Sequence, residues 1–250
     1  MPSDRRDQDR RRERGDDGAS QSGRQGREQP RRIVAGKGTT LPKWLREEIT
    51  RVTRKDRLEE TLFLLEAGTE AFANAQYQKA RSLLLKTKQL SPRASAIREL
   101  LGLSAYRMGL WKEALTELRT YRRLTGDTVQ MPVEMDALRA LDRDEDVHRV
   151  WEELLELGGR PEVLKEGRVV FASFLIDHGE VRRAWEVANP KRMEQNPFEE
   201  DLRQWFVAAR AAALLGDGDT ALKLAKAIEK HDPSMPGLDD LRTEIRNARS

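Results

Sequence analysis

The sequence predicts an all-α fold in which about five pairs of helices repeat along the chain as a solenoid. Small residues and an aromatic residue recur 34 positions apart between residues 62 and 126. The recurring pairs are Gly68 with Gly102, Tyr77 with Trp111, and Ala80 with Ala114. A period of this length is typical of two-helix units that bury their apolar faces against neighbouring units.

The composition narrows the possible functions. Of 250 residues, 36% are charged, 38% are hydrophobic and none is cysteine. The lack of cysteine excludes disulfides, thiolate zinc sites and cysteine catalysis. No apolar run near the N-terminus resembles a secretory signal, and the longest apolar run, residues 169–176, is too short to span a bilayer. We therefore expect a cytoplasmic protein.

Positive charge is concentrated near the N-terminus. Residues 1–58 contain 17 Lys/Arg and 10 Asp/Glu, whereas the remaining 192 residues contain 29 and 33. Residues 1–40 are rich in arginine and lack aromatic residues, which predicts a disordered tail. The interleaved acidic residues favour a solubilising role for this tail. The alternative is an electrostatic contact with RNA or with an acidic surface.

Residues 35–40 (AGKGTT) contain part of a phosphate-binding loop. The complete motif requires a glycine five positions before Gly36, where this chain has Arg31, and a helix that starts after the loop. Pro42 and the polar flank argue against that context. A glycine linker is the favoured interpretation, and no cofactor is expected.

Residues 41–58 predict an amphipathic leader helix. Thr40 can cap this helix, and Pro42 suits its first turn. Its apolar stripe consists of Trp44, Leu45, Ile49 and Val52. We expect it to cover the open end of the array, above Leu62, Leu65 and Phe72. The alternative is a helix that binds a partner.

The repeat domain is expected at residues 59–250, and its first unit spans about 61–94. In this unit Gly68, Tyr77, Ala80 and Pro92 stand at the four marked places of the tetratricopeptide repeat, and the unit resembles that family. The second unit spans about 95–128. Ala71 departs from the family, which usually has an aromatic residue at that place.

The later units are more divergent. The marker residues are Ala80, Ala114, Val147, Ala184 and Ala221, which lie 34, 33, 37 and 37 positions apart. The fourth unit is expected to begin near Lys165. The longer gaps predict extended helices or loops around residues 158–159 and 189–197. Leu238, Leu241 and Ile245 at helical spacing predict a terminal capping helix.

The resemblance implies a right-handed superhelix whose first helices line a concave binding surface. Projected onto this chain, it implies partner-contacting residues at Tyr106, Arg107, Arg139, Asp177, Arg203 and Arg210. Leu65 and Thr69 stand where some family members clamp a peptide carboxylate with lysine and asparagine, so a co-chaperone role is not implied. Tail, leader helix and array together resemble a group of actinobacterial repeat proteins, which implies no particular activity.

No arrangement of residues points to catalysis. His148, His178 and His231 do not share a helical face with carboxylates at metal-ligand spacing, so neither a metal site nor a catalytic site is expected. We therefore predict a non-enzymatic scaffold that binds a protein or peptide on its concave face. The alternative is an RNA- or ribosome-associated factor that uses the basic tail.

Overall fold

The computed structural model describes residues 41–248, which fold as helices joined by turns and loops, with no strand in that range. The predictions for residues 1–40, including the tail, the glycine-rich segment and the Thr40 cap, lie outside the described residues. The helices are α1 (Lys43–Val52), the short 3-10 helix η1 (Lys55–Arg57), α2 (Leu58–Ala73), α3 (Tyr77–Leu90), α4 (Ser95–Arg107), α5 (Trp111–Thr125), α6 (Met131–Arg139), α7 (Asp144–Leu157), α8 (Pro161–Asp177), α9 (Val181–Ala188), α10 (Glu199–Leu214), α11 (Gly218–His231) and α12 (Leu238–Ala248).

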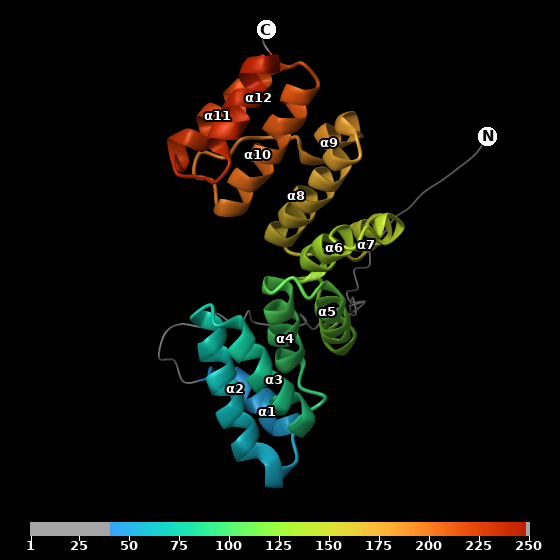
Figure 1. The fold of residues 1–250 in the computed structure, drawn as a ribbon, viewed down its shortest axis with the longest axis vertical. Coiled ribbons are helices and arrows are strands. Elements are labelled where there is room, and N and C mark those ends of the chain that lie inside the picture. The colour runs from blue at the N-terminus through green and yellow to red at the C-terminus, as the bar shows by residue number, and fades with distance from the viewer. Residues whose placement is uncertain (1–40, 249–250) are drawn as a thin grey trace, which may run out of the picture. The chain divides into compact units, whose positions relative to one another are not determined.

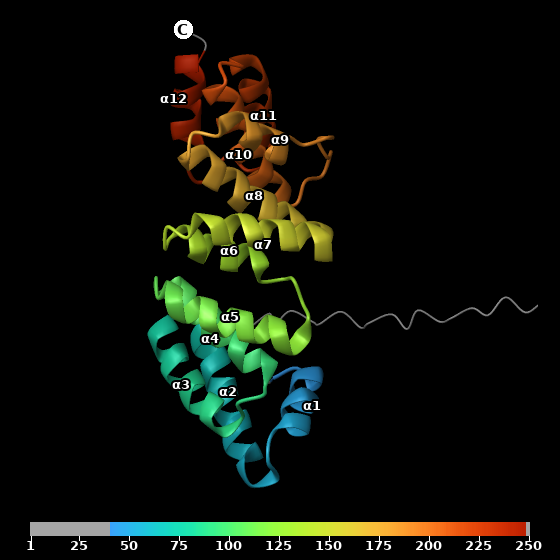
Figure 2. The ribbon, with the colours of Figure 1, turned by 90° about the vertical axis from the view of Figure 1, so that its right-hand side faces the viewer.

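The helices pack mainly as neighbouring pairs in chain order (Figures 1 and 2). The pairs are α2/α3, α4/α5, α6/α7, α8/α9 and α10/α11, while α1 packs against α2, and α12 packs against α10 and α11. The first helix of one pair also contacts the first helix of the next, as α6 does with α8 and α8 with α10. The all-α prediction is therefore confirmed for the described residues.

The turns inside the five pairs share one backbone geometry. One residue in each turn has a φ angle between 53° and 81°, in the left-handed region. The N–H of the following residue donates a hydrogen bond of 2.9–3.0 Å to the carbonyl five positions earlier, which ends the first helix. The left-handed residues are Ala75, Gly109, Asp142, Gly179 and Gly216. Each lies five positions before a marker residue, so the units remain equivalent although their lengths differ.

Small residues let the two helices of a pair approach closely. The marker residues, including Val147, are fully buried. A Cβ atom at Gly102 would lie 2.6 Å from Cδ2 of Leu118, and one at Gly68 would lie 3.1 Å from Cδ2 of Leu84. Glycine is therefore the residue that permits the α4–α5 contact.

The leader helix is shorter than predicted. Instead of continuing to residue 58, α1 ends at Val52, and Thr53 adopts an extended conformation. The buried Thr53 hydroxyl donates a hydrogen bond of 2.8 Å to Oγ of Ser91. This contact stabilises the non-helical conformation of Thr53 between α1 and η1. Leu45 and Ile49 of α1 are fully buried. They belong to one apolar cluster with the buried Leu65, against which Leu62 and Phe72 also pack.

The extra length in the fourth unit is divided between a helix and a loop. The helix α8 begins at Pro161, earlier than the predicted Lys165, and runs for 17 residues. The helix α9 has only 8 residues, and a non-helical segment follows it up to Phe198. The loop predicted around residues 189–197 is therefore confirmed, and near Gly158 three non-helical residues, 158–160, join α7 to the long helix α8.

Candidate functional site on the first helices

A small groove of ≈ 210 Å³ opens where α4, α6 and α8 meet. Each of these is the first helix of its pair, so three consecutive units contribute to one surface. The lining residues are Tyr106, Pro132, Val133, Asp136, Arg139, Glu166, Val169, Val170 and Ser173. The three valines are half-buried and, with Pro132, give the groove an apolar part. The other five side chains are polar and supply donors and acceptors.

A network of polar contacts crosses one side of the groove. The Tyr106 hydroxyl donates to Oδ2 of Asp136 at 2.6 Å, and Nη1 of Arg139 donates to Oδ1 of the same carboxylate at 3.1 Å. Nε of Arg139 also donates to Oδ2 of Asp177, which lies on α8, at 2.8 Å. Trp111 packs edge-on against the Tyr106 ring, with the ring centroids 5.5 Å apart. These contacts hold the phenol and the guanidinium in place.

Tyr106 stays protonated under ordinary conditions. Burial raises the pKa of its phenol well above the usual value, and the hydrogen bond to the Asp136 carboxylate raises it further. The Tyr106 hydroxyl therefore acts as a hydrogen-bond donor at this site and does not act as a base.

On the α8 side of the groove, Arg203 of α10 binds the lining residue Glu166. Its Nε donates to Oε1 of Glu166 at 2.9 Å, and a second nitrogen forms an ion pair with Glu199. Burial lowers the pKa of Arg203, but the two carboxylates offset this effect and leave the pKa above its usual value. Glu166 is therefore a groove carboxylate whose charge is already balanced.

The polar contacts along the first helices join residues about one repeat apart. The separations are 30 residues for Tyr106 and Asp136, 38 for Arg139 and Asp177, 37 for Arg203 and Glu166, and 34 for Arg210 and Glu244. The structure thus brings Tyr106, Arg139 and Asp177 into one network, which Arg203 flanks. Arg210 instead binds Glu244 of α12, and Arg107 is exposed outside the groove. Whether the six residues contact a partner stays a prediction.

Sequence reasoning missed that these arginines are engaged within the protein. The usable signal was the recurrence of an opposite charge one repeat length away from each arginine. It also missed Pro132, Val133 and Val170 as lining residues. Val133 lies three positions before Asp136, on the same helical face, so its place could have been inferred from Asp136.

The three histidines lie apart from one another, and two of them, His178 and His231, are exposed. Both ring nitrogens of His178 have an acceptor: the Phe174 carbonyl at 2.9 Å and a carboxylate oxygen of Asp144 at 3.1 Å. The pKa of His178 is raised, first by the Phe174 carbonyl and then by Asp144, against a lowering by partial burial. His148 packs edge-on against Phe174, and His231 lies 6.5 Å from the Trp205 ring. Within residues 41–248 no group of three or more metal-ligating side chains gathers at one point.

Comparison with protein-family models, with curated proteins and with solved structures found no match to this chain. None of the helices in the described part of the chain is both long enough and apolar enough to cross a membrane.

Proposed function

We propose that the protein is a non-catalytic scaffold of the tetratricopeptide-repeat type, a right-handed superhelix that binds a partner protein on its first helices. The observation that carries the proposal is the groove to which α4, α6 and α8 all contribute. A site built by consecutive units is what a repeat array offers and what a single helix pair does not. Tyrosine and arginine, which are enriched among the residues that dominate binding energy, both line it.

The groove chemistry selects the partner segment. Val133, Val169 and Val170 provide an apolar wall, and a volume of ≈ 210 Å³ suits one side chain better than a small-molecule ligand. The contacts of Arg139 with Asp136 and Asp177 use three of its five N–H donors. The proposed ligand is therefore a peptide segment with an aliphatic side chain and a neighbouring carboxylate, which binds beside Arg139.

Site-directed photocrosslinking tests this proposal. A photoreactive amino acid at Ser173, inside the groove, should capture a partner that the same group at Thr50 does not capture. Thr50 is a matched control because it is an exposed helical residue whose hydroxyl donates to the carbonyl four positions earlier, as that of Ser173 does.

Purified partner then gives the quantitative test. Ser173→Arg should fill the groove and weaken binding by about tenfold or more, whereas Thr50→Arg should leave the affinity within about twofold. Equal crosslinking at both positions, or an unchanged affinity of Ser173→Arg, would exclude the groove lined by α4, α6 and α8 (the first-helix groove) as the binding surface.

A second candidate function is contact with RNA or the ribosome through the basic N-terminal segment. The observation that favours it is the positive charge of residues 1–58, which contain 17 Lys/Arg but only 10 Asp/Glu. Removal of residues 1–40 should then weaken RNA binding and flatten its dependence on salt. Equal RNA affinity of the full and the shortened chain would refute this candidate.

A further inference from the structure

A second pocket, of ≈ 340 Å³, lies between α5 and the turn that joins α6 to α7. Its lining residues are Lys112, Leu115, Thr116, Arg119, Leu141 and Arg143. Half of them are cationic and none is acidic. The two leucines provide an apolar floor, because Leu115 is buried and Leu141 is half-buried.

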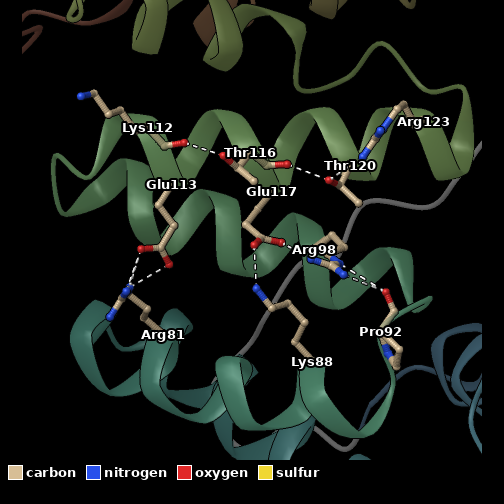
Figure 3. Close-up of polar contacts among 10 residues, drawn as sticks. All are labelled: Arg81, Lys88, Pro92, Arg98, Lys112, Glu113, Thr116, Glu117, Thr120 and Arg123. Carbon is tan, nitrogen blue, oxygen red and sulfur yellow. Dashed lines mark hydrogen bonds and ion pairs between the residues drawn. The ribbon is translucent and has the colours of Figure 1, made fainter.

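The acidic side of α5 is engaged elsewhere (Figure 3). Glu113 receives Nη2 of Arg81 at 2.7 Å, and the buried Glu117 receives Lys88 at 2.8 Å and Arg98 at 2.7 Å. These contacts turn both carboxylates toward α3 and α4, while Lys112 and Thr116 lie along another side of α5 in the same view. No acidic residue of α5 therefore neutralises the pocket.

The carboxylates that pair with the two arginines of the pocket are shared with other arginines. The closest atom of Arg119 lies 3.8 Å from the Glu134 carboxylate, which Arg122 approaches more closely, at 3.2 Å. Asp146 forms ion pairs with both Arg143 and Arg149. The side chain of Lys112 is exposed, and none of the ion pairs seen in residues 41–248 includes it.

Burial and three neighbouring arginines both lower the pKa of Arg119. Burial lowers the pKa of its guanidinium most, and Glu134 opposes this effect. The charges of Arg143, Arg122 and Arg149 then lower it further. The net result is a pKa below the usual value, with burial as its largest cause and the neighbouring cations as a smaller one.

A hydrogen-bonded turn forms one edge of the pocket. Asp142 adopts a left-handed conformation with a φ angle of 53°, and the Arg143 N–H donates to the Leu138 carbonyl at 3.0 Å. This is the same hydrogen-bonded turn that the other four pairs use. The turn therefore fixes the backbone of Arg143 beside α5, and less backbone order has to be gained on binding.

We propose that this pocket binds one phosphate monoester, carried on a phosphorylated side chain of a partner protein. A phosphate of this kind has a charge of about −1.5 to −2 near neutral pH and three acceptor oxygens, which matches a site with two guanidinium groups and one ammonium. The leucine floor accommodates the short carbon stem of a phosphorylated serine or threonine. This site is separate from the first-helix groove and goes beyond the proposed function.

The flanking charges favour a single phosphate over a nucleic acid. Arg143 lies in the sequence Asp142-Arg143-Asp144-Glu145, and Asp142 and Glu145 are exposed. A polyanion that continued beyond the pocket would meet these carboxylates. None of the six lining residues is aromatic, so no base could stack there.

Calorimetric titration of the full chain tests the proposal with defined probes. The probes are a five-residue peptide with a central phosphothreonine, the same peptide without phosphate, inorganic phosphate, and a ten-nucleotide uridine RNA. The phosphopeptide should bind at least about tenfold more tightly than the unmodified peptide and inorganic phosphate, and more weakly as salt increases.

Two substitutions and one matched control locate the site. Lys112→Gln and Arg119→Gln should each weaken phosphopeptide binding by about tenfold. Arg123→Gln removes the same charge from the same helix outside the pocket, and should change the affinity by less than about twofold. Lys112 is exposed, so its substitution should leave folding intact, and circular dichroism would check the fold of both variants.

Three results would overturn the proposal. An equal loss with Arg123→Gln would show that only overall charge matters. Equal affinity for both peptides, or for the phosphopeptide and inorganic phosphate, would remove the phosphorylated side chain as ligand. RNA that binds more tightly than the phosphopeptide and loses affinity in the Lys112 and Arg119 variants would assign the pocket to nucleic acid instead.

Discussion

Substitution of alanine for Gly102 should destabilise the protein, whereas the same change at Gly68, the equivalent place one unit earlier, should not. A Cβ atom at Gly102 would lie 2.6 Å from Cδ2 of Leu118 and 3.2 Å from its backbone nitrogen. At Gly68 the nearest atoms are Cδ2 and Cγ of Leu84, both at 3.1 Å. The two positions have the same role but differ in how closely the second helix approaches.

The distances set the expected free energies of unfolding. Ordinary contact begins near 3.4 Å, so Leu118 must recede by about 0.8 Å and Leu84 by only about 0.3 Å. Alanine is favoured over glycine in a helix by about 1 kcal/mol, whereas overpacking costs about 1–3 kcal/mol. We expect Gly102→Ala to lower the stability by about 1–2 kcal/mol, because the backbone nitrogen cannot rotate away. Gly68→Ala should leave the stability unchanged within about 0.5 kcal/mol, or raise it.

Urea unfolding followed by circular dichroism measures both effects. The midpoint should fall for Gly102→Ala at an unchanged slope. In a double-mutant cycle with Leu118→Ala, the loss for the pair should be about 1–2 kcal/mol smaller than the sum of the single losses, because the truncated side chain no longer meets the new methyl group. Equal stabilisation by Gly68→Ala and Gly102→Ala, together with additivity in the cycle, would refute the close helix contact.

Two further predictions concern the turns inside the helix pairs. Ala75→Gly should raise the stability by about 0.5–1 kcal/mol and Gly109→Ala should lower it by about 1 kcal/mol, because both positions are left-handed, where a Cβ is unfavourable. Thermal melting checks both variants, and shifts of the melting temperature with the same sign would contradict the prediction. Asp217→Ala should cost about 1 kcal/mol at pH 7, since the Asp217 carboxylate accepts the Thr220 N–H at 3.0 Å at the start of α11. The side chain of Thr220 and its backbone N–H both lower the pKa of Asp217 below its ordinary value of 3.8. The stabilisation is therefore present above pH 3.8 and disappears as the pH falls through the folded-state pKa. A difference from wild type that stayed constant down to pH 2 would contradict the assignment.

The sequence by itself determined the order and the type of the helices. Small residues at fixed intervals indicate places where two helices touch. The two helices of a pair are neighbours in the chain, so their contact can be inferred from the spacing of these residues. The recurring positions from Ala80 to Ala221 therefore predicted helix pairs. The left-handed turn residues could be inferred only where glycine occupies them, as at Gly109. At Ala75 and Asp142 the neighbouring hydrogen bonds impose the same conformation on residues that do not prefer it.

Only the tertiary structure decided where α1 ends and what the candidate site contains. The helix-breaking contact of Thr53 is with Ser91, 38 residues away, and no local pattern contains it. Arg139 and Arg203, which the sequence predicts to contact a partner, also form ion pairs with carboxylates about one repeat away. A long charged side chain can reach solvent, a partner or a neighbouring helix with little difference in local energy. Packing of adjacent units therefore selects among these possibilities, and a single sequence does not.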